Sequence, residues 1–221
     1  MAVSKRVVIV GGVAAGPKVA ARIMRLEPSA KVTVVEKGIF VSYSGCGLPY
    51  YISGQVSSQA ELMCTPLGVV RDPDYFRQSK RLEVLNHHEG LRIDRRANRL
   101  LVRNLEDGQE RWLDYDKLVL CTGGSPVIPR PLPGRDLPQV FQLHGVEDAE
   151  GVREVLAGER ARDAVIIGGG LIGVEVTEAL VSKGCRVTIL EATDQILGLI
   201  DAEMAALVAQ HMEGKGCLLY T

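Results

Sequence analysis

The sequence predicts an α/β protein built from two strand–helix–strand units, each with a glycine-rich turn between its first strand and its helix. Residues 6–10 form a short β-branched run that leads into the turn GGVAAG at residues 11–16. Residues 164–167 form a second such run, which leads into GGGLIG at residues 168–173. Runs without polar alternation are typical of parallel strands buried on both faces, and parallel strands are joined by helices. The two units therefore predict two Rossmann-like, dinucleotide-binding domains.

The first unit continues as a helix over residues 18–26 and a strand over residues 31–36 that ends in Glu36. Backbone N–H groups and the positive end of the helix favour a pyrophosphate at such a turn. An acid at the end of the second strand can accept a hydrogen bond from a ribose hydroxyl. Val13 stands at the second glycine position of the G-x-G-x-x-G pattern, so a plain turn without a ligand stays open as the alternative.

The stretch FVSYSGCGLPYYISG at residues 40–54 places one cysteine between two glycines. Glycines on either side of Cys46 allow the backbone to approach a planar ligand closely. Pro49 suits the first turn of a helix, and the positive end of that helix would lower the pKa of a nearby thiol and favour the thiolate that attacks disulfides. A dithiol pair would need a second cysteine where Tyr51 stands. We therefore predict that Cys46 is a redox thiol that works alone, through a mixed disulfide, a persulfide or a sulfenic acid.

The middle of the chain predicts an antiparallel insert over about residues 82–114, with a hairpin turn at Asp107-Gly108. The insert is expected to have two or three strands, taken from residues 82–85, 100–104 and 111–113. A buried strand is expected over residues 116–121. The proline-rich residues 126–140 are the predicted linker between the domains.

The second glycine turn matches the G-x-G-x-x-G pattern completely, with Gly168, Gly170 and Gly173. A helix over residues 171–182 and a strand that ends in Glu191 complete the unit. An acid at this place bonds a ribose 2′-hydroxyl but repels a 2′-phosphate. The sequence therefore favours NADH over NADPH at the second turn.

Composition and charge exclude several classes of protein. The chain has 221 residues and a net charge of -1, so its overall charge does not suggest nucleic acid or an anionic membrane as a partner. The apolar runs are shorter than the ~18 residues of a membrane helix. The five cysteines have no C-x-x-C spacing, and His87 and His88 are adjacent and expected at the surface, so no metal site is predicted. The N-terminus leads directly into a strand without the pattern of a signal peptide, so we expect a cytoplasmic protein.

The spacing S-x-x-x-C-G-x-P-Y at residues 42–50, after a glycine-turn nucleotide unit, resembles the single-cysteine flavoprotein reductases of the pyridine nucleotide-disulfide oxidoreductase superfamily. That group includes coenzyme A-disulfide reductases, coenzyme A-persulfide reductases, and NADH oxidases and peroxidases. The resemblance implies FAD in the first unit, NADH or NADPH in the second, and Cys46 as the redox centre. The implied FAD contacts are Gly11, Ala14, Ala15, Glu36, Lys37, Thr122 and Gly123. The implied nicotinamide cofactor contacts are Gly168, Gly170, Leu171, Ile172, Gly173 and Glu191.

Two features of the first unit favour a coenzyme A-linked substrate. Oxidase and peroxidase members carry a histidine in the first glycine turn, where this sequence has Ala14. The coenzyme A-disulfide reductases carry basic or polar residues on the first helix and a serine four residues before the cysteine, which Lys18, Arg22, Arg25 and Ser42 match. The three basic residues share one helix face and can pair with phosphates, although a solvated basic face stays open as the alternative.

We therefore predict an FAD-dependent NAD(P)H oxidoreductase that reduces a small-molecule disulfide or persulfide linked to coenzyme A. The FAD domain is expected at residues 1–145 and an incomplete NAD(P) domain at residues 146–221. The alternatives are an NADH oxidase or peroxidase that uses a cysteine sulfenic acid, and a catalytically incomplete nucleotide-binding fragment. By resemblance the complete enzyme is longer than this chain and forms a homodimer.

Overall fold

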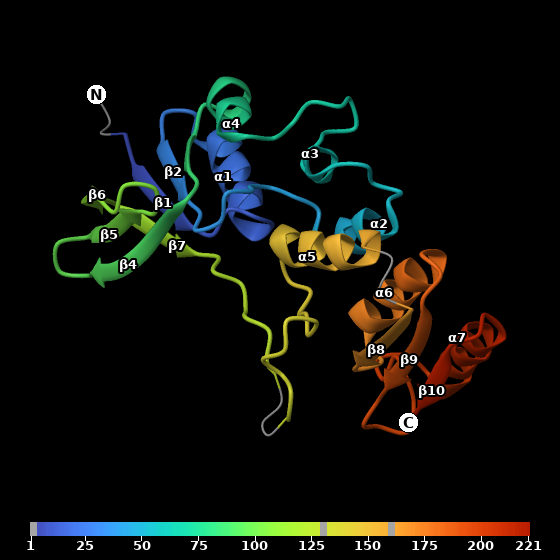
Figure 1. The fold of residues 1–221 in the computed structure, drawn as a ribbon. Helices are drawn as coiled ribbons and strands as arrows, with labels where there is room; N and C mark the ends of the chain where they lie inside the picture. The colour runs from blue at the N-terminus through green and yellow to red at the C-terminus, as the bar shows by residue number, and fades with distance from the viewer. Residues whose placement is uncertain (1–3, 129–131, 159–161) are drawn as a thin grey trace. The chain divides into compact units, whose positions relative to one another are not determined.

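The computed structural model describes residues 4–128, 132–158 and 162–221 (Figure 1). The chain forms two compact units. The first contains the chain up to Ser44 and Ala60–Ser125, and the second contains Gly45–Gln59 and Pro126–Thr221. The segment with Cys46 therefore packs within the second unit. The predicted α/β class is confirmed, whereas the assignment of an FAD domain and an NAD(P) domain stays a prediction.

The first unit contains a parallel sheet with the strand order β3-β2-β1-β7. Its strands are β1 (Arg6–Val10), β2 (Lys31–Val35), β3 (Glu83–Leu85) and β7 (Lys117–Leu120). One face of the sheet packs against the helices α1 (Ala15–Leu26) and α4 (Pro73–Lys80). Ala20 of α1 and Phe76 of α4 join Ile9 and Val34 of the sheet in one buried cluster. The predicted strands at the start of the chain and the helix between them are confirmed.

The other face of that sheet packs against an antiparallel sheet with the order β4-β5-β6. Its strands are β4 (His88–Asp94), β5 (Arg99–Asn104) and β6 (Glu110–Asp114). Val102 of β5 packs with Val8 and Val35 of the parallel sheet. The first two strands of the chain are therefore buried on both faces, as their unbroken apolar runs predict. The hairpin turn is also confirmed, since Gly108 has φ +72° between β5 and β6.

The predicted insert is wrong at its first strand, and the predicted buried strand is only partly buried. The segment expected as the first strand of the insert forms β3, which pairs parallel with β2 through Val84 and Val34. Burial decides this pairing, because Leu82 and Val84 reach the apolar cluster beneath α4. The first strand of the insert is instead β4, which begins at His88. β7 lies at the edge of its sheet, which leaves Leu120 59% exposed.

The second unit contains a parallel sheet with the order β10-β9-β8. Its strands are β8 (Asp163–Ile167), β9 (Arg186–Leu190) and β10 (Leu218–Tyr220), and the helices beside them are α6 (Leu171–Ser182) and α7 (Ala202–Gly214). Val187 and Ile189 of β9 are buried, whereas Val165 and Ile167 of β8 are exposed. The predicted elements of this unit are confirmed, but its sheet has one exposed apolar face.

Two shorter helices complete the second unit. α2 (Leu48–Ser53) packs against α5 (Val146–Ala157) and against α6. A further short helix, α3 (Gln59–Leu62), stands where the chain passes between the units. Part of the predicted linker, including Pro129 and Pro131, lies outside the described residues. In the described ranges, none of the helices is both long enough and apolar enough to span a membrane.

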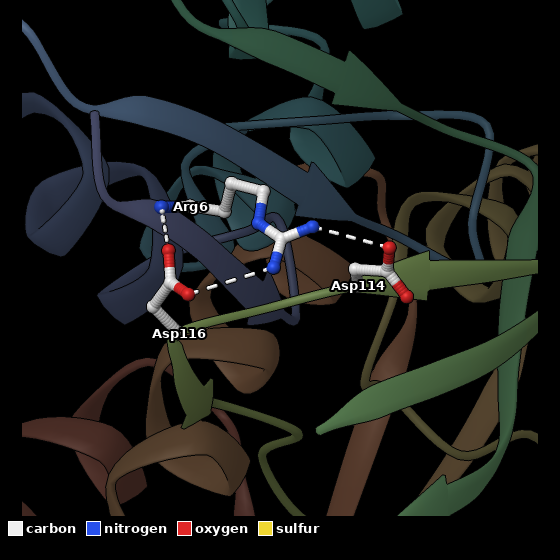
Figure 2. A network of polar contacts seen from close by, with 3 residues as sticks. All are labelled: Arg6, Asp114 and Asp116. Atoms are coloured by element: carbon white, nitrogen blue, oxygen red, sulfur yellow. Dashed lines mark hydrogen bonds and ion pairs between the residues drawn. The ribbon is translucent and has the colours of Figure 1, made fainter. Parts of the chain in front are cut away.

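A polar network ties the start of β1 to the connection between β6 and β7 (Figure 2). The Asp116 carboxylate accepts the backbone N–H of Arg6 at 2.7 Å, and its other oxygen lies 3.5 Å from the Arg6 guanidinium. Arg6 also donates to Asp114 at 3.1 Å. The hydrogen bond from the Arg6 backbone, followed by the guanidinium, lowers the pKa of Asp116 from its ordinary 3.8. The network joins strands that are more than 100 residues apart in the sequence.

The lowered pKa of Asp116 predicts a pH-dependent contribution to stability. The ionised carboxylate is favoured by folding, so its contribution is present above pH 3.8 and is lost as the pH falls through the lower pKa of the folded state. We expect Asp116→Asn to lower the urea midpoint at neutral pH, and the difference from the wild type to narrow below pH 3.8. Urea titrations across this range measure the effect, with Asp107→Asn in the exposed hairpin turn as the charge-matched control. A constant difference at all pH values would contradict it.

Candidate functional site

The first glycine turn lies where β1 ends and α1 begins. Gly11 has φ +109° and donates its N–H to Val35 at 2.8 Å. A Cβ on Gly16 would lie 1.8 Å from the carbonyl oxygen of Gly11, so only glycine lets α1 approach the strand this closely. The helix begins at Ala15, after Ala14, and in the described residues its first turn has no side-chain cap. Its first N–H groups are therefore available to an anion.

Glu36, which follows β2, stabilises this turn by hydrogen bonds. Its carboxylate accepts the N–H of Gly12 at 2.5 Å and the N–H of Gly38 at 2.7 Å. Ser42 has φ +52° and donates its N–H to the Gly12 carbonyl at 2.8 Å. A carboxylate that is already fixed by backbone donors presents its remaining lone pairs in a set direction.

Thr122 and Gly123 lie after β7, beside the same turn. The N–H of Cys121 donates to Val10 at 2.7 Å, and a Cβ on Gly11 would lie 2.0 Å from the Cys121 carbonyl oxygen. Both Thr122 and Gly123 are exposed. The structure thus brings together the first turn and the segment after β7, which sequence reasoning connected only through the family resemblance.

The other predicted residues of the first unit are on its surface or just beneath it. Lys18, Arg22 and Arg25 are exposed along α1. Ser42 is half-buried. The Lys37 ammonium pairs with Glu89 of β4 at 2.9 Å. The basic side chains of α1 are therefore accessible to solutes.

The second glycine turn repeats the construction of the first. Gly168 has φ +105° and donates its N–H to Leu190 at 2.8 Å. A Cβ on Gly173 would lie 2.1 Å from the Gly168 carbonyl oxygen. Leu197, with φ +52°, donates to the Gly169 carbonyl at 2.8 Å, as Ser42 does to Gly12 in the first unit. The exposed Leu171 and Ile172 begin α6. In the part of the chain that the structure describes, no heavy atom beyond the chain neighbours of Gly170 lies within 4 Å of a Cβ built on that residue.

Glu191 stabilises the second turn by hydrogen bonds, as Glu36 does for the first. One carboxylate oxygen accepts the N–H of Gly169 at 2.7 Å. The other accepts the N–H groups of Ala192 and Thr193 and the Thr193 hydroxyl. The backbone hydrogen bond from Thr193, followed by that from Gly169, lowers the pKa of Glu191. The side chain is therefore ionised at neutral pH and repels a second anion beside it.

Cys46 lies in a short 3₁₀ turn, Gly45–Gly47, immediately before α2. Pro49 stands in the first turn of that helix, as the sequence predicts. The cysteines of the described residues differ in access: Cys46 is exposed, Cys64 and Cys121 are half-buried, and Cys185 and Cys217 are buried. Burial raises the pKa of both buried thiols. Of these thiols, Cys46 is therefore the most accessible to a dissolved substrate.

Sequence reasoning missed the contacts that close each glycine turn: Gly12 and Gly169 lie within the turns but were assigned no role, and Ser42 was predicted only for its match to the coenzyme A-disulfide reductases. Gly12 and Gly169 donate to the acids, and Ser42 and Leu197 hold the carbonyls of those glycines. Aligning the two units with each other would have found the paired glycines. Ser42 and Leu197 have chemically different side chains, because the contact is made by the backbone N–H of each residue and places no demand on the side chain. The sequence therefore carries no signal for that pair.

Comparison with known proteins agrees with this geometry. Residues 5–221 match the family described as pyridine nucleotide-disulphide oxidoreductase. The NAD(P)H sulfur oxidoreductase (CoA-dependent) of Pyrococcus abyssi is 35% identical over 212 residues, which cover 96% of this chain and 45% of that protein. The structure of an NAD-dependent persulfide reductase from A. fulgidus has a TM-score of 0.92 and 40% identity, covering 98% of this chain and 39% of that one.

A third relative represents a different chemistry. The water-forming NADH oxidase from Lactobacillus brevis, solved bound to NADH, has a TM-score of 0.87 and 28% identity, covering 98% of this chain and 46% of that one. The chain thus spans less than half the length of each of these three relatives. The family match includes both glycine turns and the Cys46 turn. The chain belongs to the pyridine nucleotide-disulphide oxidoreductase family.

Proposed function

We propose that the protein containing this chain is an FAD-dependent NAD(P)H oxidoreductase that reduces a small-molecule disulfide or persulfide linked to coenzyme A. The observation that carries the proposal is the exposed Cys46 in a glycine turn before α2, in a chain with two glycine turns of the same construction. Two dinucleotide sites suit an electron path from a nicotinamide to a flavin. An accessible thiol suits a sulfur acceptor.

Both glycine turns have the features that a dinucleotide requires. In the first, the N–H groups at the start of α1 are available for the pyrophosphate of FAD, and Glu36 for its ribose. In the second, the open space at Gly170 and the start of α6 are available for the pyrophosphate of the nicotinamide cofactor. Glu191 is the ribose acceptor there. When bound, FAD would supply two-electron transfer between the nicotinamide and the thiol.

In the proposed reaction the Cys46 thiolate attacks one sulfur of the substrate. The S–S bond of the substrate breaks, one thiol leaves with a proton, and Cys46 forms a mixed disulfide with the other half. Two electrons from NADH and one further proton then release the second thiol and restore Cys46. The sum is one NADH oxidised, one proton consumed and one S–S bond reduced, which yields two thiols from a disulfide and one thiol with hydrogen sulfide from a persulfide. Lys18, Arg22 and Arg25 on α1 are the proposed contacts for the phosphates of coenzyme A.

The ionised Glu191 predicts a preference for NADH over NADPH. We expect Glu191→Gln to keep an acceptor for the Gly169 N–H but to remove the charge that repels a 2′-phosphate. The ratio of NADPH to NADH dissociation constants should fall by about tenfold or more, as expected for the loss of one charged contact. Fluorescence titration with each cofactor measures the ratio, and Asp194→Asn is the control. An unchanged ratio would mean that residues other than Glu191 discriminate between NADH and NADPH.

Parallel acceptor assays test the proposed function directly. NADH oxidation by the natural protein that contains this chain is measured with coenzyme A disulfide, coenzyme A persulfide, oxygen and hydrogen peroxide. We expect a sulfur acceptor to give the highest kcat/KM, with release of free thiol. Higher kcat/KM with oxygen or peroxide would instead support the oxidase or peroxidase alternative, which the similarity to the Lactobacillus brevis enzyme keeps open.

The purified chain provides a second test of the cofactor sites. We expect it to bind FAD and to show a flavin absorption spectrum after reconstitution. Absence of flavin binding by the chain alone would support the alternative of a catalytically incomplete nucleotide-binding fragment. The acceptor assays on the longer protein then decide the activity independently.

A further inference from the structure

We propose that Tyr51, Glu150 and Arg153 form an anchor between α2 and α5 that positions the Cys46 thiol for reaction. The inference rests on the proposed function only in taking Cys46 as the reacting group. All of these residues belong to the second compact unit. We call this set of contacts the Tyr51 anchor.

The first contact of the Tyr51 anchor is a hydrogen bond from a buried phenol to a carboxylate. The Tyr51 side chain is 4% exposed, and its hydroxyl donates to Oε2 of Glu150. Gln59, which follows α2, donates its amide to the same oxygen at 3.0 Å. Burial raises the pKa of Tyr51, and the hydrogen bond from Tyr51 lowers the pKa of Glu150. The pair is therefore a neutral phenol and an ionised carboxylate at neutral pH, a strong type of hydrogen bond.

The second contact comes from Arg153, one helical turn further along α5. Its guanidinium carbon lies 4.1 Å from the centroid of the Tyr51 ring, in cation–π geometry. Its Nη1 also donates to the backbone carbonyl of Tyr51 at 3.1 Å. Gly54 donates to the same carbonyl at 3.1 Å and ends α2 with φ +81°. Arg153 therefore holds the ring and the last turn of α2 together.

The anchor matters because the turn that carries Cys46 is weakly constrained by its own sequence. Cys46 stands between two glycines, and α2 has six residues, too few for a helix to be stable by itself. The place of the thiol therefore depends on what holds α2. Tyr51 stands where a dithiol would need its second cysteine, and its side chain instead forms a hydrogen bond with Glu150 of α5. A displacement of about 1 Å at a reacting group can slow a reaction about a hundredfold.

Substitutions in the anchor separate positioning from general stability. The test variants are Arg153→Met, which removes both Arg153 contacts, and Tyr51→Phe, which keeps the ring but removes the hydroxyl. Arg153→Lys restores charge without the planar stack, and Glu154→Gln on the exposed side of α5 is the control. Amide hydrogen exchange is followed over residues 45–54 and over β1 and β9 in the 221-residue chain. The reductase kcat and KM are measured in the natural protein that contains the chain.

We expect Arg153→Met to speed exchange over residues 45–54 by about tenfold or more, with β1 and β9 unchanged, because only a local opening is made easier. The kcat should fall by about tenfold while KM for NADH is unchanged, and Arg153→Lys should recover part of it. Tyr51→Phe should give the same pattern at smaller size, and Glu154→Gln should match the wild type.

Two results would overturn the anchor. The first is unchanged exchange over residues 45–54 in folded Arg153→Met and Tyr51→Phe variants. The second is faster exchange in the same proportion over β1, β9 and residues 45–54, which would mean a purely structural role. Failure of the proposed function can be told apart from failure of the anchor. If the proposed function is wrong, the Cys46→Ser variant keeps reductase activity, whereas the expected changes in hydrogen exchange are still observed in the anchor variants.

Discussion

Replacing Cys46 with serine is expected to abolish reduction of the proposed disulfide or persulfide substrate, with kcat at least about a thousandfold lower. A serine hydroxyl is almost fully protonated at neutral pH and cannot form an S–S bond with the substrate. The remaining cysteines are less accessible than Cys46, because Cys64 and Cys121 are half-buried and Cys185 and Cys217 are buried. The loss should therefore be nearly complete and confined to the sulfur step.

Thiol release under NADH measures this prediction in the natural protein that contains the chain. NADH binding, followed by fluorescence, should be the same in Cys46→Ser and in the wild type, since Cys46 and the second glycine turn stand on different elements. Cys64→Ser is the matched control and should retain activity. Reductase activity within tenfold of the wild type in Cys46→Ser would disprove the proposed reaction.

Replacing Gly173 with alanine is expected to destabilise the second unit by about 3 kcal/mol or more. The new Cβ would lie 2.1 Å from the carbonyl oxygen of Gly168 and 3.2 Å from the side chain of Ile166. The first of these atoms is backbone, so the clash can be relieved only by moving α6 away from β8. Such a movement also displaces the N–H groups at the start of α6, which are the proposed contacts of the pyrophosphate. Urea unfolding of the 221-residue chain and NADH titration measure the two effects.

Gly170→Ala provides the matched control for Gly173→Ala within the same turn. Gly170 has φ -75°, and within the described residues no heavy atom beyond its chain neighbours lies within 4 Å of its Cβ position, so alanine is free of clash and of backbone strain. Stability should change by less than about 1 kcal/mol. NADH affinity should still fall about tenfold, because the methyl group occupies the space where the pyrophosphate approaches in the proposed cofactor site. Equal losses of stability in the two variants would contradict the close-packing role of Gly173.

Much of the secondary structure follows from the sequence because local chemistry marks it. The glycine turns stand at abrupt changes from β-branched runs to helical spacing, and Pro49 marks a helix start. The wrong prediction concerned Leu82 and Val84, which form a short run without a distinguishing period. Such a run can pair with any neighbouring strand, and only burial beneath α4 selects the parallel sheet.

Some residues of the candidate site can be predicted from the sequence, and others cannot. Gly168 and Gly173 are predictable because a positive φ and a close backbone approach require glycine there, Gly170 because it completes the fingerprint spacing, and Glu191 because it follows the adjacent strand. The Tyr51 anchor is not predictable, since its partners on α5 are about 100 residues away in the sequence. Contacts of that separation depend on how helices pack, and helix packing has no short-range sequence code.

The sequence alone determined the two glycine turns, the acids that follow them and the isolated cysteine among small residues. These features are local, since they depend on backbone conformation and on the spacing of neighbouring residues. The tertiary structure decided which cysteine is exposed, which strand joins which sheet, and that Cys46 packs in the same unit as the second glycine turn. Those properties depend on the burial of surfaces that are distant in the chain. The hydrophobic effect that drives burial is non-directional, so a short apolar stretch indicates that it is buried but not against which surface.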